Sequence, residues 1–86
     1  MKRRAIVLLK LVELNSNWSE IFASNVRRRR KALGLSQEEI AHRVGIDVRY
    51  LGGIERNQEN PSLQVMVGIA DALGTTPASL LTPEPE

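Results

Sequence analysis

The chain has 86 residues, of which 42% are hydrophobic and 26% are charged. This length accommodates one domain with one core, and the composition is too apolar for a disordered chain. With no cysteine and a single histidine, the composition excludes a disulfide scaffold and argues against a metal-centred enzyme or a Cys/His nucleophile. The three aromatic residues are too few for a platform that stacks single-stranded bases. These features favour a small binding module.

Positive charge is concentrated in the first part of the chain. Residues 1–34 contain nine Lys or Arg against two Glu, whereas residues 35–86 contain three Arg against eight acidic residues. The two parts therefore carry net charges of +7 and −5. Such segregation is typical of proteins with one side that faces a polyanion. For the run Arg27–Lys31 taken alone, a solvated helix face explains the charges equally well.

The first residues look like the start of a signal peptide but lack the rest of one. A basic stretch at 2–4 precedes an apolar run at 5–9, which Lys10 and Glu13 then interrupt, and no small-residue cleavage site follows. The run is also far shorter than the ~20 apolar residues of a membrane span. We therefore expect a cytoplasmic protein.

Residues 1–17 are expected to form an extension that precedes the domain. Leu8, Leu11 and Val12 share one face at helical spacing, although the period alone does not exclude a strand over the apolar run. A compact five-helix core offers this face no partner. It either packs back on the domain or forms a subunit interface.

The remaining chain is expected to be all-α. Capping signals and apolar spacing predict five short helices, with the domain over residues 18–82 and a frayed tail over 83–86. The expected helices cover about 18–33, 36–44, 48–56, 61–73 and 76–81. Ser36, Asp47 and Thr76 are the expected N-caps, and Leu33 and Leu63 are expected on inward-facing stripes.

The strongest pattern lies between residues 37 and 56, where two short helices flank Gly45-Ile46-Asp47. Ala41 is small enough for the helices to approach closely, and Gly45 permits the positive φ of a sharp turn. Apolar residues that fix the crossing angle are Ile40, Val44, Ile46, Leu51 and Ile54. This is the helix-turn-helix pattern, which presents its second helix to the DNA major groove.

Residues 20–82 resemble the lambda-repressor-like, Cro/Xre-type helix-turn-helix domain. The matching segments are Val26-Arg27-x-x-Arg30, Gly34 to Ala41, Gly45-Ile46, Ile54-Glu55-Arg56, Asn60 to Leu63 and Ile69-Ala70-x-x-Leu73-Gly74. The resemblance implies a compact five-helix DNA-binding domain without enzymatic activity, cofactor or metal. The stretch 54–62 is similar to restriction–modification controller proteins and to general Xre-type regulators.

The resemblance also implies residue roles. Bases would be read by Val48, Arg49, Gly52, Gly53 and Gln37, with Arg49 suited to guanine and Val48 to a thymine methyl. Phosphates would be bound by Ser36, Gln37, Tyr50, Asn57 and Asn60, to which the basic first helix adds Arg27. Arg30 and Glu55 match a family pair that joins the first and third helices. Leu80 and Leu81 lie where this family commonly dimerises.

Three features depart from the family pattern. Gly52 and Gly53 replace longer polar residues, which indicates either close approach of the backbone to DNA or simply weaker binding to it. Arg29 stands where an apolar residue is common, and its stem is expected to pack while its charged end reaches solvent. Glu59 stands where related sequences often carry Arg, which removes a positive charge from the phosphate loop.

We therefore expect a bacterial or phage-type transcriptional regulator that binds double-stranded DNA as a homodimer at a pseudo-palindrome. No membrane association and no small-molecule ligand are evident. The alternative is a protein-interaction module, such as an antitoxin-like or anti-repressor subunit, that uses the helix-turn-helix as a scaffold.

Overall fold

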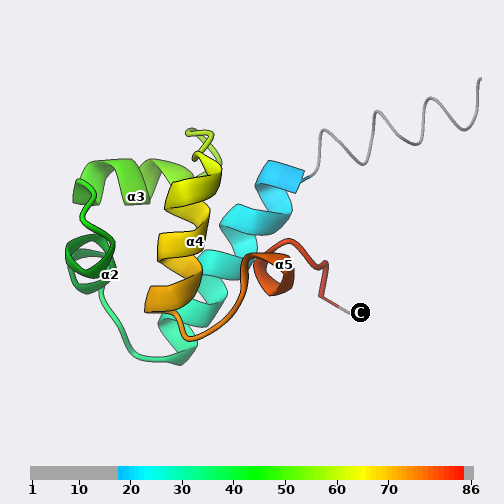
Figure 1. Ribbon diagram of the computed structural model, residues 1–86, viewed down its shortest axis with the longest axis horizontal. Helices are drawn as coiled ribbons and strands as arrows, with labels where there is room; N and C mark the ends of the chain where they lie inside the picture. The colour runs from blue at the N-terminus through cyan, green and yellow to red at the C-terminus, as the bar shows by residue number, and fades with distance from the viewer. Residues whose placement is uncertain (1–17, 85–86) are drawn as a thin grey trace, which may run out of the picture.

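The computed structural model describes residues 18–84, and every regular element in that range is a helix (Figure 1). A helix over residues 18–32 is followed by α2 (Gln37–Val44), α3 (Val48–Glu55), α4 (Leu63–Ala72) and α5 (Pro77–Leu80). In the view of Figure 1, α2 and α3 lie on one side of α4 and α5 lies on the other. The expected all-α, five-helix fold is confirmed.

One apolar core joins all five helices. Its fully buried large side chains are Val26, Ile40, Leu51, Ile54, Ile69 and Leu73. Each helix contributes its inward stripe, so no helix stands apart from this core. Burial of these side chains is the main stabilising term of the fold.

Two leucines expected to face inward are exposed. Leu33 is 50% exposed and Leu63 is 67% exposed. Leu33 follows the last residue of the first helix, and Leu63 is the first residue of α4. Both positions continue the apolar spacing, but they lie at helix ends that the neighbouring helices do not cover. The inward assignment was therefore wrong for these two residues.

The expected N-caps are confirmed by their hydrogen bonds. The Ser36 hydroxyl accepts from the Glu39 amide (3.0 Å) and the Asp47 carboxylate accepts from the Arg49 amide (2.7 Å). Thr76 caps α5 in the same way, with Pro77 at the first helical position. The Ser36 hydroxyl also donates to the Glu39 carboxylate (3.3 Å), so the two side chains contact each other at the start of α2.

The turn between α2 and α3 depends on Gly45. Its φ is +81°, and its amide donates to the carbonyl of Ala41 (2.8 Å), which also accepts from Ile46 (3.0 Å). A Cβ added to Gly45 would meet no atom within 4 Å. The requirement for glycine at this position is therefore conformational and not steric.

Substitution of Gly45 tests this interpretation. Gly45→Ala is expected to lower the free energy of unfolding by about 1–2 kcal/mol, because an L side chain is strained at this φ. Gly45→Asn, the matched control, should lose less, since asparagine tolerates the left-handed conformation. Urea unfolding measures both, and an alanine variant as stable as the parent would contradict the interpretation.

Candidate nucleic-acid interface

Helix α3 has one buried and one outward face. Leu51, Ile54 and Glu55 are buried against the rest of the domain. Arg49, Gly52, Gly53 and Arg56 recur at helical spacing on the opposite face. Because this face carries no part of the core, it is the face that can enter a groove of DNA.

The orientation of α3 is fixed by a network of polar side chains at its last residue. Arg30 of the first helix makes a two-pronged ion pair with Glu55, with Nε–Oε2 and Nη2–Oε1 distances of 2.7 and 2.9 Å. Gln37 of α2 donates to the same Glu55 carboxylate (3.1 Å). The three helices are therefore joined at one buried carboxylate.

This pair is well shielded, with side-chain exposures of 11% for Arg30 and 2% for Glu55. The hydrogen bonds with Glu55 raise the pKa of Arg30 above its ordinary value, against the opposing effect of burial. The shielded pair therefore links the first and third helices.

The first turn of α3 presents the residues expected to read bases. Arg49 is exposed, and its amide is held by the Asp47 cap. Val48 and Tyr50 are partly buried and pack against the core while leaving part of each side chain accessible. An exposed guanidinium beside an apolar surface is a combination that suits guanine and thymine edges in the major groove.

The loop after α3 begins with a left-handed residue. Asn57 has a φ of +58°, and the amide of Gln58 donates back to the carbonyl of Gly53 (2.7 Å). This is the Schellman type of helix end, with asparagine in the position usually taken by glycine. Asn57 and Asn60 are both exposed, as binding to phosphates requires.

The glycines of α3 do not form an open surface. Both are buried, Gly52 beneath the guanidinium of Arg56 and Gly53 beneath the stem of Glu59. A Cβ on Gly52 would lie 3.0 Å from Nη1 of Arg56, and one on Gly53 would lie 2.6 Å from Cγ of Glu59. The part of α3 expected to approach DNA directly is thus covered by two charged side chains.

The arginines at 27–29 have different surroundings. Arg29 is exposed, and its charged end donates to the carbonyls of Leu73 (2.8 Å) and Gly74 (3.2 Å) at the end of α4. Arg28 contacts Asn25 and lies 2.9 Å from Glu84. Arg27 is exposed, three residues before the Arg30 that contacts α3. Of these three side chains, Arg27 is the one whose position fits a phosphate contact.

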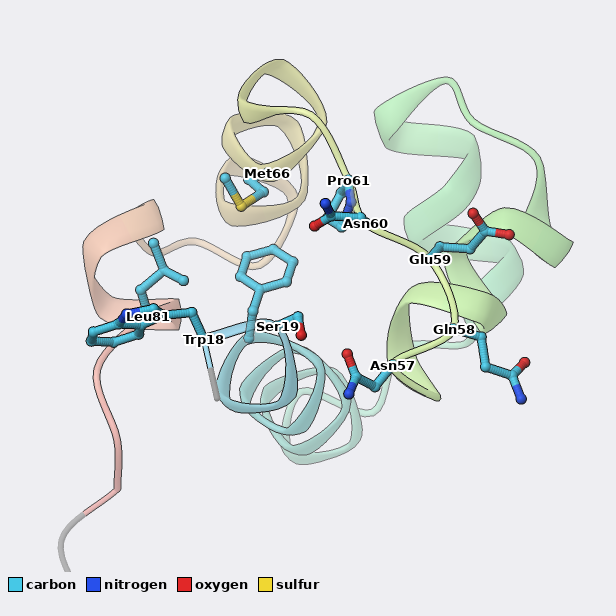
Figure 2. Close-up of a pocket in the computed structure, with 10 residues that line it drawn as sticks. Trp18, Ser19, Asn57, Gln58, Glu59, Asn60, Pro61, Met66 and Leu81 are labelled. Carbon is cyan, nitrogen blue, oxygen red and sulfur yellow. The ribbon is translucent and has the colours of Figure 1, made fainter. Parts of the chain in front are cut away.

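A cavity of about 540 Å³ lies beside this loop (Figure 2). Figure 2 shows Trp18, Met66 and Leu81 on one side of it and the loop with Asn57 and Glu59 on the other. Its lining combines polar residues of the loop with apolar residues of the first helix, α4 and the C-terminal segment.

The interface candidates have different environments. Leu80 is 2% exposed and packs in the core, so its side chain is not available to a subunit interface. Leu81 is partly buried and lines the cavity. Leu8, Leu11 and Val12 lie outside the described residues.

The described residues hold no cluster of His, Asp or Glu that could bind a metal ion. Among residues 18–84, no helix is both long and apolar enough to cross a membrane.

Comparisons with known proteins agree with this geometry. The family model described as "Helix-turn-helix" matches residues 26–80. The chain belongs to the helix-turn-helix family of DNA-binding transcriptional regulators. This confirms the resemblance to the Cro/Xre type, a class of regulators and not of enzymes.

Three helix-turn-helix relatives illustrate the similarity. The chain is 37% identical to the HTH-type transcriptional regulator y4dJ of Sinorhizobium fredii over 67 residues, covering 78% of this chain and 87% of y4dJ. It is 41% identical to the control protein C.SmaI of Serratia marcescens over 63 residues, covering 73% and 75%. The crystal structure of the restriction-modification controller protein C.AhdI from Aeromonas hydrophila superposes with a TM-score of 0.68 at 43% identity, covering 70% and 91%.

Within this helix-turn-helix domain, sequence reasoning missed two polar anchors. Asn25 is buried and donates to the carbonyls of Leu80 (2.8 Å) and Thr82 (2.9 Å), which fastens the C-terminal segment to the first helix. Arg56 covers Gly52 and is held by Gln58 (3.0 Å). The four-residue spacing from Gly52 to Arg56 is the signal that could have found the second anchor.

Proposed function

We propose that this protein is a sequence-specific regulator that binds double-stranded DNA as a homodimer at a pseudo-palindromic operator. The observation that carries the proposal is α3, whose exposed Arg49 is presented by a helix locked through Glu55 to two others. Two such helices, related by a two-fold axis, would enter successive major grooves ~34 Å apart. Because the angle of α3 to the rest of the domain is fixed, both copies of the helix would enter their grooves in the same orientation.

The energetics of recognition support the homodimer. One copy of α3 offers few groups for base contacts, and each well-formed contact discriminates by only ~1–3 kcal/mol. Specific recognition among genomic competitors needs ~4–10 kcal/mol, which two half-sites supply. Within the described residues, partly buried Leu81 is the side chain that we assign to the interface.

The similarity to C.SmaI and C.AhdI favours genes of a restriction–modification system as the regulated targets. Because the proposed target is genomic DNA of a bacterium or phage, the cytoplasm is the compartment in which the protein would act.

Selection from a randomised duplex pool tests the proposal. The purified chain at near-physiological salt should enrich a two-fold symmetric motif. Retention of duplex without a motif would contradict sequence-specific binding. No retention at all would favour the interaction module instead.

A salt titration tests the phosphate contact assigned to Arg27. Arg27→Gln removes one positive charge, so it should reduce the slope of log affinity against log salt by about 0.9 for each phosphate that Arg27 neutralises. It should weaken all sequences alike, since phosphates carry no sequence information.

Arg28→Gln is the matched control for this titration. Its guanidinium is already engaged by Asn25 and Glu84, so the slope should stay close to that of the parent. Equal slopes for the parent and Arg27→Gln would show that Arg27 faces solvent in the complex.

A further inference from the structure

The stem of Glu59, in the loop after α3, lies against the backbone of that helix at Gly53. The Glu59 stem lies so close to the backbone of α3 that an added Cβ would sit 2.6 Å from its Cγ. Only glycine permits this approach, because real Cβ atoms do not come so near. Glu59 itself is exposed, so the contact positions a surface side chain on the outward face of α3.

The chemistry of this side chain differs from that of its surroundings. A carboxylate carries only hydrogen-bond acceptors, and near DNA phosphates it is repelled. The guanidinium of Arg56, placed over the adjacent Gly52, lowers this cost by supplying a positive charge on the same face. The Glu59 carboxylate, in the loop after α3 and with its stem against the outward face of that helix, suits a base that offers a donor in the major groove.

We propose that Glu59 is a base-reading residue whose carboxylate accepts a hydrogen bond from the exocyclic amine of a cytosine in the major groove. Cytosine offers only this N4 donor there, whereas adenine places the N7 acceptor beside its amine and would repel the second carboxylate oxygen. Gly53 is the positioning residue, because its lack of a Cβ lets the stem of Glu59 lie against the backbone of α3. This inference rests on the proposed function and deepens it.

Selection with Glu59→Gln tests the assignment. Glutamine keeps the shape but adds donors, and it pairs with the N6 and N7 atoms of adenine. One position in each half-site should therefore change from cytosine to adenine, with a discrimination of roughly 5- to 150-fold. Because Glu59 is exposed, the variant should fold like the parent, which a thermal melt checks.

Asp71→Asn is the matched control, since it removes the same charge from an exposed position on α4. Its motif should equal that of the parent. If Glu59→Gln also keeps the parental motif and merely binds all sequences more tightly, Glu59 is only a charge and the proposal is overturned. If the parent enriches no motif, the proposed function fails and this inference fails with it.

Gly53→Ala provides an independent check. The added methyl should displace the Glu59 stem and weaken the cytosine preference, while improving helix propensity so that folding is retained. In the Glu59→Ala background the same substitution should have no further effect on base preference. Equal effects in both backgrounds would show that Gly53 does not act through Glu59.

Discussion

Arg30→Ala is expected to destabilise the domain by about 3–5 kcal/mol, because it leaves a buried carboxylate without its charge partner. Glu55 is nearly inaccessible, and within residues 18–84 it would retain only the side-chain amide of Gln37 as a hydrogen-bond donor. The carbonyl of Leu35, which accepts from Arg30 (2.9 Å), would also lose its donor. Denaturant unfolding followed by circular dichroism measures the loss.

The double variant Arg30→Met with Glu55→Leu separates the pair's contribution to stability from its contribution to orientation. Removing both charges avoids an unpaired buried group, so most of the stability should return. Its DNA selectivity should nevertheless fall, since α3 would no longer be fixed through Glu55. If Arg30→Ala alone lowers the free energy of unfolding by less than about 1 kcal/mol, water has replaced Arg30 as the partner of Glu55.

Arg49→Ala is expected to remove base preference at one position in each half-site. The loss should be about 1–3 kcal/mol per half-site, or roughly 5- to 150-fold in affinity for the preferred base at each. Arg49 is exposed at the start of α3, so stability should change little. Binding to the selected duplex and to duplexes substituted at that position measures the effect.

Two further variants sharpen this result. Arg43→Ala removes an exposed arginine from the last turn of α2, and it should leave the motif unchanged. Arg49→Lys keeps the charge but loses the two-pronged geometry, so it should behave more like alanine than like the parent in base preference. An Arg49→Ala variant with the parental motif would place base reading elsewhere.

The elements that sequence reasoning predicted well are those set by local chemistry. The caps at Ser36, Asp47 and Thr76 depend on residues two or three positions apart, so they are visible in the sequence. The turn at Gly45 is likewise local. Exposure of Leu33 and Leu63 could not be predicted, because it depends on where neighbouring helices end.

The candidate site likewise has a part that local sequence predicts and a part that depends on the fold. The first turn of α3 follows from the helix-turn-helix pattern, since spacing alone assigns its outward residues. Coverage of Gly53 by Glu59 depends on the path of the loop after α3, which the helix-turn-helix pattern does not specify. The contact of Arg29 with the end of α4 spans 44 positions in the sequence, and only the folded chain brings these groups together.

The ratio of affinities for the selected duplex and for a shuffled duplex of equal composition tests the central claim most directly. Both dissociation constants should be measured with the parent protein at the same near-physiological salt. Specific recognition by two copies of α3 predicts a ratio of at least about 10³. A ratio near one would contradict it, because charge alone would then account for all of the binding.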